Sequence, residues 1–239
     1  MSLLVVDVYQ ETQHGHPVWA PLLADPTYVG AILKCTQGIA YPTAWFHQQW
    51  SALRAAAGDR YGASFVRGAY HFLMFDDDPV RQATYYLDTV AAAGGWDHGD
   101  LIPIVDVERA DGNEHATAAQ VTACVTAFVA EVAKATGQDV MIYGRGAMRD
   151  LHITSTFGAQ WLWNPGYTAT MPSAAEQGWP DDTVALWQYT DGTHGDAPGL
   201  PRETPGLGAV DASVYRGASF AQLCATIVRR PSQGARSTT

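Results

Sequence analysis

Short apolar runs alternate along this chain with longer segments in which apolar residues return every three or four positions. Runs of the first kind are typical of buried β-strands, and segments of the second kind are typical of helices with one apolar face. The runs predict eight strands, at Leu3–Val8, Val29–Cys35, Phe65–Phe72, Leu101–Val107, Val140–Tyr143, Gln160–Trp163, Val184–Tyr189 and Ala209–Ala212.

Helix-length segments separate the first five strands, and several of them have clear boundaries. The boundary signals are an apolar stripe from Thr43 to Ala57 that stops at Gly58, Asp78 before Pro79, a capping box from Thr117 to Gln120, and Ser219 before a last stripe. Strands joined by helices favour a parallel sheet. Loops richer in Gly, Pro and Trp separate the last three strands, so we predict an α/β fold, a single TIM-like barrel with a less regular final part.

The length of 239 residues suits one large domain, and no internal repeat divides the chain. We assign residues 1–229 to the barrel and expect the polar stretch 230–239 to be a flexible tail. The three cysteines lie far apart in apolar segments, which predicts buried thiols. Neither a metal site nor a cofactor is expected.

A formal charge of −10 limits the classes of partner. Nucleic-acid binding needs clusters of Lys and Arg, and the sequence shows none. No unbroken apolar run reaches about 18 residues, so we expect no membrane insertion. The segment from Met1 to Asp7 lacks the basic region of a signal peptide. We expect a monomer.

The predicted strand at 101–107 ends in two acids, Asp106 and Glu108. Side chains two positions apart share a face of a strand, so both carboxylates point the same way, with Cα atoms roughly 6.5 Å apart. Acids this close raise the pKa of one of them. Glycosidases make a proton donor and a stabilising charge from such a pair. Two solvated acids at an exposed strand end are the alternative.

Functional groups of parallel barrels gather where the strands end. The predicted strand ends carry many aromatic residues and four acids, Asp7, Asp106, Glu108 and Asp211. Alternation places Ile104 on the inner face with the acids of its strand, and Val105 and Val107 on the outer face. Aromatic walls with convergent acids suit sugar rings.

The order of the motifs resembles one known family. The motifs are Asp7-Val8-Tyr9-Gln10, Lys34-Cys35-Thr36-Gln37-Gly38, Tyr70-His71-Phe72, Asp106-Val107-Glu108, Trp187-Gln188-Tyr189 and Val210-Asp211. As a set, spanning Asp7 to about Gly217, they are similar to those of the glycoside hydrolase family 25 muramidases, the Chalaropsis-type lysozymes common among phage endolysins.

The resemblance implies a (β/α)5β3 barrel that cleaves the β-1,4 bond between N-acetylmuramic acid and N-acetylglucosamine in bacterial peptidoglycan. It implies that Glu108 is the general acid and that Asp106 supplies a stabilising charge at the reacting sugar. Asp7 and Asp211 match the other two acids of the family site. Substrate contacts are expected from Tyr70, Tyr143, Trp163, Trp187, Gln188 and Lys34.

Two positions depart from the family pattern. Tyr9 stands where the family usually has Ser, and Gln37 stands where it usually has Glu. Neither removes an acid assigned to chemistry, but both change the rim of the expected site.

Other interpretations stay open. The chain can be a non-catalytic glycan-binding protein on the same barrel, or a glycosidase for another amino-sugar polymer such as chitin. Its setting is open too: a phage-encoded enzyme released from the host cytoplasm through a holin-type lesion, or a bacterial enzyme secreted by another route.

Overall fold

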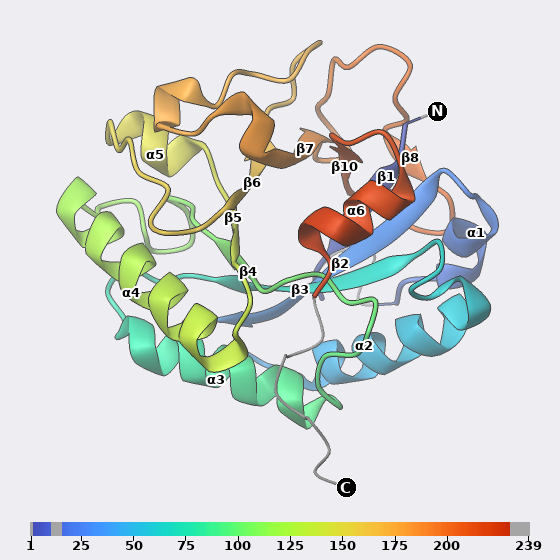
Figure 1. The fold of residues 1–239 in the computed structure, drawn as a ribbon, viewed down its shortest axis with the longest axis horizontal. Coiled ribbons are helices and arrows are strands. Elements are labelled where there is room, and N and C mark those ends of the chain that lie inside the picture. Colours follow the sequence, from blue (N-terminus) through green and yellow to red (C-terminus); the bar gives the residue numbers. More distant parts are fainter. Residues whose placement is uncertain (1, 11–15, 230–239) are drawn as a thin grey trace, which may run out of the picture.

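A closed barrel of eight strands forms the centre of the computed structural model, which describes residues 2–10 and 16–229 (Figure 1). The strands are β1 (Leu4–Val8), β2 (Tyr28–Gln37), β3 (Val66–Phe72), β4 (Ile104–Asp106), β5 (Met141–Tyr143), β6 (Trp161–Pro165), β7 (Val184–Thr190) and β10 (Asp211–Tyr215). Their order around the barrel is β1-β10-β7-β6-β5-β4-β3-β2. Neighbours are parallel except at β10, which runs antiparallel to β1 and β7.

Each of the first five strands is followed by a helix, and β10 is followed by a sixth. The helices are α1 (Trp19–Ala24), α2 (Ala44–Ala57), α3 (Pro79–Ala92), α4 (Ala118–Thr136), α5 (Gly146–Asp150) and α6 (Phe220–Ile227). Within the described residues, the connections also contain three 3-10 helices and a two-stranded hairpin: η2 (Gly58–Arg60), η3 (Ala175–Gln177), η4 (Asp181–Thr183), β8 (Glu203–Thr204) and β9 (Gly208–Ala209). This order confirms the α/β barrel and its (β/α)5β3 arrangement.

The helix boundaries follow the capping signals of the sequence. The Asp78 side chain accepts hydrogen bonds from two backbone N–H groups at the start of α3, and Thr117 and Gln120 form a capping box on α4. Ser219 caps α6 through the backbone N–H of Gln222. Helices α1 and α5 were not predicted, because six and five residues are too few for a periodic apolar stripe.

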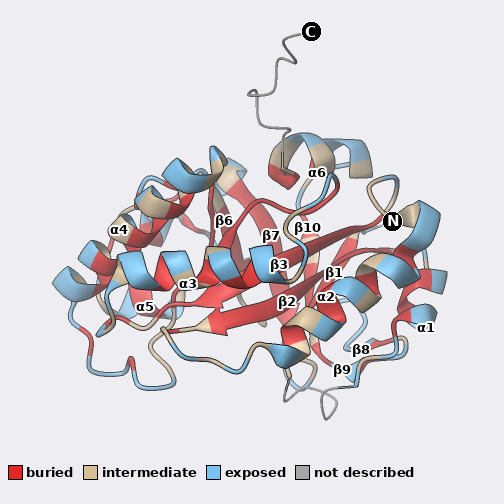
Figure 2. Ribbon diagram, turned by 90° about the horizontal axis from the view of Figure 1, so that it is seen from below, coloured by how far each residue is buried: buried red, intermediate tan, exposed pale blue. Residues whose placement is uncertain are grey.

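Strand alternation separates two apolar clusters, one inside the barrel and one between the barrel and its helices. Val5 and Ile104 belong to the inner cluster, whereas Val105 and Val107 belong to the outer one, as the sequence predicts. Figure 2 shows the strands buried and the helices buried only on the faces they turn to the barrel. Side chains that alternation turns to the inner face of these strands therefore meet at the barrel axis.

Helix α6 covers the end of the barrel where the parallel strands begin (Figure 1). Leu223 and Ile227 of this helix join the inner cluster together with Leu101 and Ile102. The backbone N–H of Ile102 donates to the carbonyl of Ile227 at 2.9 Å. The opposite end, where the parallel strands finish, is the end available for a ligand.

Two strand predictions need correction. The strand predicted at Leu101–Val107 is regular only in β4: Leu101 still donates to the carbonyl of Arg67 on β3 and forms a bridge with Val228, but residues 102 and 103 interrupt the strand. The strand predicted at Ala209–Ala212 is wrong in its limits: Gly208–Ala209 pairs with β8, and β10 starts at Asp211. Because β10 is antiparallel, its first residue lies at the same barrel end as the last residues of the parallel strands.

Among the described residues, helix α4 alone is long and apolar enough to cross a membrane, judged by length and composition only. Its buried side chains are Val121, Cys124, Val125, Phe128, Val129 and Val132, which belong to the outer cluster. Packing in the helical layer of the barrel accounts for this apolar stripe.

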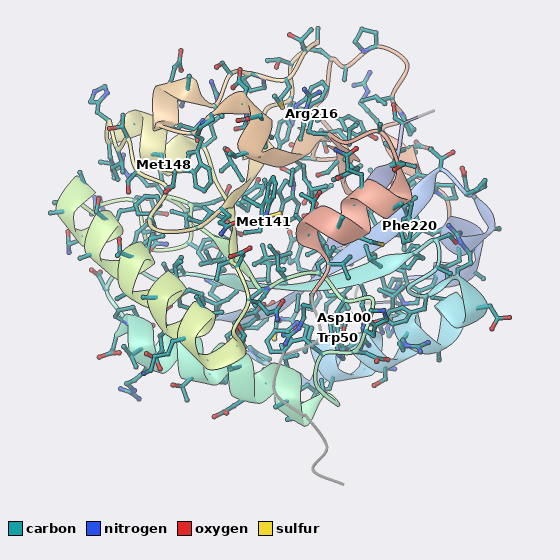
Figure 3. The ribbon with its side chains drawn as sticks, viewed as in Figure 1. Trp50, Asp100, Met141, Met148, Arg216 and Phe220 are labelled. Carbon is teal, nitrogen blue, oxygen red and sulfur yellow. The ribbon has the colours of Figure 1, made fainter. Side chains whose placement is uncertain are left out.

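A buried ion pair lies where strands β3 and β4 approach α2. Arg67 Nε and Nη2 donate to the two carboxylate oxygens of Asp100 at 2.7 and 3.2 Å. The guanidinium lies 3.7 Å from the centre of the Trp50 ring, and the Tyr61 hydroxyl also bonds to Asp100. Trp50 and Asp100 are labelled side by side in Figure 3. The charges of Arg67 and Asp100 therefore neutralise each other through two parallel hydrogen bonds.

We expect Asp100→Asn to lower the free energy of unfolding by about 3–5 kcal/mol, because it leaves the buried Arg67 charge uncompensated. Denaturant unfolding followed by tryptophan fluorescence measures this loss. The matched control is Glu131→Gln, which removes an exposed ion pair with Lys134 at 3.4 Å and should cost at most about 1 kcal/mol. Equal losses in the two variants would contradict the expectation.

Candidate active site

An open pocket of about 240 Å³ lies at the barrel end where the parallel strands finish. It brings together all four predicted acids and five of the six predicted substrate contacts. Its lining residues are Asp7, Tyr9, Lys34, Tyr70, Phe72, Asp106, Glu108, Ala110, Asp111, Tyr143, Trp163, Gln188 and Asp211. The described residues contain no cluster of His, Cys, Asp or Glu that could hold a metal ion.

Strand register places the acids. Asp7 of β1 and Asp211 of β10 are direct partners across the antiparallel pair that closes the barrel. Asp106 is the last residue of β4 and lies opposite Tyr143 of β5. Glu108 follows two residues later and lines the same pocket. The acids thus come from both ends of the chain and meet only because the barrel closes.

Trp187 is the predicted substrate contact that does not join the pocket lining. It precedes Gln188 on β7, and alternation turns it to the outer cluster when Gln188 faces inward. Its ring Nε1 donates to the backbone carbonyl of Gly166 at 2.8 Å. Trp163 does face the pocket, where its ring meets that of Tyr143 edge to face at 4.8 Å.

His71 also lies outside the pocket, because it faces outward between Tyr70 and Phe72. Its Nδ1 pairs with the Thr36 hydroxyl at 2.8 Å, and its Nε2 pairs with Gln82 Oε1 at 3.1 Å. Burial lowers the pKa of His71 to about 3. A neutral imidazole so enclosed connects β2, β3 and α3 and is structural.

Burial dominates the electrostatics of Asp106 and Glu108. Burial raises the pKa of Asp106, and the neighbouring Glu108 carboxylate raises it further, while the Lys34 ammonium opposes both. Burial likewise raises the pKa of Glu108, and a hydrogen bond from Tyr143 to the ionised carboxylate works in the opposite direction. Asp106 Oδ1 is buried and has no hydrogen-bond partner among the described residues. The pair therefore retains a proton more readily than an exposed pair would.

Asp7 and Asp211 form a second acidic pair on the other side of the pocket. Burial raises the pKa of Asp7, and the charge of Asp211 adds to the effect. Burial raises the pKa of Asp211 to about 7, although a hydrogen bond from Asp7 lowers it. Both carboxyl groups therefore retain protons more readily than exposed acids do.

A chain of hydrogen bonds crosses the pocket wall between the two acidic pairs. The Gln188 side-chain carbonyl accepts from Tyr143 at 2.8 Å and from Tyr167 at 3.0 Å. The amide nitrogen of Gln188 donates to the two oxygens of Asp7 at 3.4 and 3.2 Å. Tyr167 was not predicted, because it lies in the irregular segment after β6, where no strand periodicity identifies its direction.

Lys34 lies at the rim among aromatic rings. Its ammonium donates to Gln37 Oε1 at 2.7 Å and lies 5.7, 5.1 and 4.9 Å from the ring centres of Tyr9, Tyr41 and Phe72. Both positions that depart from the family pattern are therefore in contact with one cation. Tyr41, like Tyr167, comes from a loop and was not predicted.

Comparison with known proteins gives the site a context. The sequence profile described as glycosyl hydrolases family 25 matches residues 6–199. No curated protein sequence matches the chain significantly. Among solved structures, a bacterial lysozyme from Streptomyces coelicolor is similar, with 21% identity, a TM-score of 0.73 and coverage of 95% of this chain and 97% of that one.

Two further solved structures have the same fold. A family 25 glycosyl hydrolase from Bacillus anthracis has 21% identity and a TM-score of 0.71, with 92% of each chain covered. A family GH25 lysozyme from Aspergillus fumigatus has 18% identity and a TM-score of 0.67, with 95% of this chain and 99% of that one covered. At these identities the likeness is one of fold.

We expect Asp211→Asn to stabilise the protein in mild alkali. Between about pH 4 and pH 7 the native state keeps a proton on Asp211 that the unfolded chain has lost, so the free energy of unfolding falls as pH rises through this range. Since one pKa unit corresponds to about 1.4 kcal/mol, the variant should gain about 1–3 kcal/mol near pH 8 and little near pH 4.

Denaturant unfolding at both pH values measures the gain. The exposed Asp139, changed to Asn, is the control and should leave the stability close to that of the wild type at both. If Asp211→Asn raises the free energy of unfolding equally at both pH values, ionisation of the buried Asp211 carboxyl group is not the cause of the gain.

Proposed function

Because the chain belongs to glycosyl hydrolases family 25 and is a glycosidase, we propose that it hydrolyses the β-1,4 bond between N-acetylmuramic acid and N-acetylglucosamine in peptidoglycan. Two of the similar solved structures, those from Streptomyces coelicolor and Aspergillus fumigatus, are described as lysozymes, which supports this substrate. The observation that carries the proposal lies in the pocket itself. A buried carboxyl oxygen without a partner lies beside a second acid whose pKa is raised.

Asp106 Oδ1 is the buried atom in question. Leaving a buried acceptor without a donor costs about 1–3 kcal/mol, so an unpaired oxygen that lines a pocket is a candidate for contact with a ligand group. The N-acetyl group of either sugar carries an amide N–H that can fill this position. An amide bond to Oδ1 would favour the ionised form of Asp106.

Substrate binding would then give Asp106 and Glu108 different protonation states. Once Asp106 is held as the carboxylate, its charge raises the pKa of Glu108, and the remaining proton resides on Glu108. Glu108 donates that proton to the bridging oxygen as the bond to the N-acetylmuramic acid ring breaks. Asp106 stabilises the positive charge that develops on the sugar and positions its acetamido group.

Two alternatives are weaker on the same observations. A non-catalytic glycan-binding barrel does not need two acidic pairs buried in its pocket, since ionised groups are costly to bury without a chemical use. A chitin-type substrate also carries N-acetyl groups, so the masses of the products distinguish it from peptidoglycan.

We expect Glu108→Gln to lower the rate of release of reducing ends from purified peptidoglycan by about 10²–10⁴-fold, because the leaving oxygen loses its proton donor. Glu114→Gln is the control: Glu114 is an exposed acid of the same connection between β4 and α4, and its removal should leave the rate unchanged. Cosedimentation with insoluble peptidoglycan checks that Glu108→Gln still binds.

Retention of a near wild-type rate by Glu108→Gln would refute the assignment of the acid. Binding without hydrolysis by the wild-type protein would instead favour the glycan-binding alternative. Mass spectrometry of the digested muropeptides should show N-acetylmuramic acid at the new reducing ends.

The proposal extends to an endolysin role, because the family that the sequence resembles is common among phage endolysins. We expect the gene to lie next to a holin gene in a phage or prophage. A neighbourhood of bacterial cell-wall genes, with no holin gene, would oppose this role and leave the activity unaffected.

A further inference from the structure

We propose that Lys34 binds a free carboxylate on the N-acetylmuramic acid ring, and that this contact makes peptide-free glycan strands the preferred substrate. The lactyl ether of this sugar ends in such a carboxylate wherever no stem peptide is attached. Lys34 is then a specificity-determining residue for the proposed function, on which this inference rests. The position of Lys34, the neutral partner of its ammonium group and the charges of the pocket carry the proposal.

An irregularity in β2 turns Lys34 and Gln37 to the same side. Side chains three positions apart in a regular strand point to opposite faces. The register of β2 against β3 shifts between Lys34 and Thr36. Cys35 packs in the outer cluster, and the Thr36 hydroxyl bonds to the outward-facing His71, so two successive residues face outward. Gln37 thereby returns to the side of Lys34, whose ammonium donates to Gln37 Oε1 at 2.7 Å.

Gln37 and three aromatic rings stabilise the Lys34 ammonium without neutralising its charge. The Gln37 side chain is an uncharged amide, and its Nε2 donates to the Met74 sulfur at 3.7 Å, which keeps its Oε1 directed at Lys34. The ring centres lie 5.7, 5.1 and 4.9 Å from the ammonium and add cation–π attraction. A carboxylate at position 37 would instead form an ion pair with Lys34. The amide thus preserves a positive charge at the rim of the pocket.

The charges of the pocket favour one place for an anionic group. Four predicted catalytic acids line the pocket, and Lys34 is the one cation among the described residues that line it. A carboxylate on the ligand is repelled by each ionised acid and attracted by the ammonium, so it is directed to the β2 side of the pocket. Because Lys34 is only 7% exposed, solvent screens its charge little.

The N-acetylmuramic acid ring carries two adjacent groups that match Asp106 and Lys34. Its acetamido group and its lactyl ether occupy neighbouring carbons of the ring. Asp106 Oδ1 is the buried acceptor proposed above for the acetamido N–H. Strand β3 separates β2 from β4, so the backbones of the two residues lie roughly 10 Å apart, and both side chains line the same pocket. A ring held at Asp106 can therefore present its lactyl carboxylate to Lys34.

A stem peptide removes the charge that Lys34 recognises. Attachment of the stem converts the lactyl carboxylate into an uncharged amide. The carboxylates of the stem itself lie farther from the ring, whereas Lys34 is set into the pocket wall. The reaction class that supplies the preferred substrate is therefore hydrolysis of the amide bond between the lactyl group and the stem. Water cleaves that bond to give the free carboxylate and a peptide with a free amino terminus.

Two soluble substrates that differ only at this group test the proposal. Peptide-free strands, prepared from peptidoglycan with an amidase, keep their lactyl carboxylates, and coupling to methylamine converts them into neutral methylamides. We expect kcat/KM of the wild type to be about 10–100-fold higher on the carboxylate strands, chiefly through KM, because the methylamide loses a charge-assisted hydrogen bond. Lys34→Met should abolish this preference.

Gln37→Glu tests the same contact while keeping the cation. The new carboxylate pairs with the Lys34 ammonium and competes with the ligand, so the preference should fall several-fold. Gln48→Glu is the control: Gln48 is exposed on α2, and the same change of charge there should leave the preference intact. A preference that survives in both Lys34→Met and Gln37→Glu, or its absence from the wild type, would overturn the proposal.

Intact strands distinguish the two sources of a carboxylate. They carry the carboxylates of the stem peptide but no free lactyl carboxylate. We expect their kcat/KM to resemble that of the methylamide strands. If intact strands instead match the peptide-free strands, the assignment to the lactyl group is wrong.

A binding measurement makes this inference distinguishable from the proposed function. Glu108→Gln keeps Lys34 and Gln37, and calorimetry with this variant measures its affinity for the carboxylate and methylamide strands. If Glu108→Gln hydrolyses the strands at a near wild-type rate, the assignment of the acid fails, while a preference for the carboxylate strands still supports Lys34. If Glu108→Gln is inactive and binds both preparations equally, the role of Lys34 alone fails.

Discussion

The antiparallel pairing of β10 with β1 is the constraint on which the site depends. It closes the barrel, and its register sets Asp7 directly opposite Asp211. Without closure, residues from the two ends of the chain would not share a pocket with Asp106 and Glu108. Closure also removes the sheet edges and encloses the inner side chains, and this burial is the main reason why the pKa values of all four acids are raised.

Buried acids are paired with a cation at one end of the barrel and are largely unpaired at the other. Near the start of the parallel strands, Asp100 is matched by the bidentate guanidinium of Arg67, which lies on the Trp50 ring. At the other end, the acids of the pocket lining outnumber Lys34, the one cation among the described residues that line it. The first arrangement neutralises a buried charge, whereas the second leaves buried carboxyl groups that hold protons more readily than exposed acids do. A stability cost concentrated at the mouth is typical of a functional site.

Strand periodicity explains what the sequence could predict. The two-residue alternation placed Ile104 and the acids of β4 inside, and the same rule applied to β7 would have turned Trp187 outward once Gln188 was placed inside. A family motif such as Trp187-Gln188-Tyr189 identifies consecutive residues but does not indicate which of them faces the pocket. Tyr41 and Tyr167 were beyond prediction because loops have no period, and the direction of β10 depends on tertiary closure and not on local pattern.

The polar side chains around the acids combine a fixed amide with hydroxyl groups that can rotate. An amide such as Gln188 offers fixed donors on one side and a fixed acceptor on the other, so it can orient its neighbours but cannot adapt to them. A phenol can exchange donation for acceptance by rotating one bond. Gln188 accepts from Tyr143 and Tyr167 through its carbonyl and donates to Asp7 through its amide nitrogen, so it connects the tyrosines of the pocket wall to the Asp7–Asp211 pair. In an enclosed pocket such polar contacts are stronger than in bulk water, and they hold the acids and their neighbours in one arrangement.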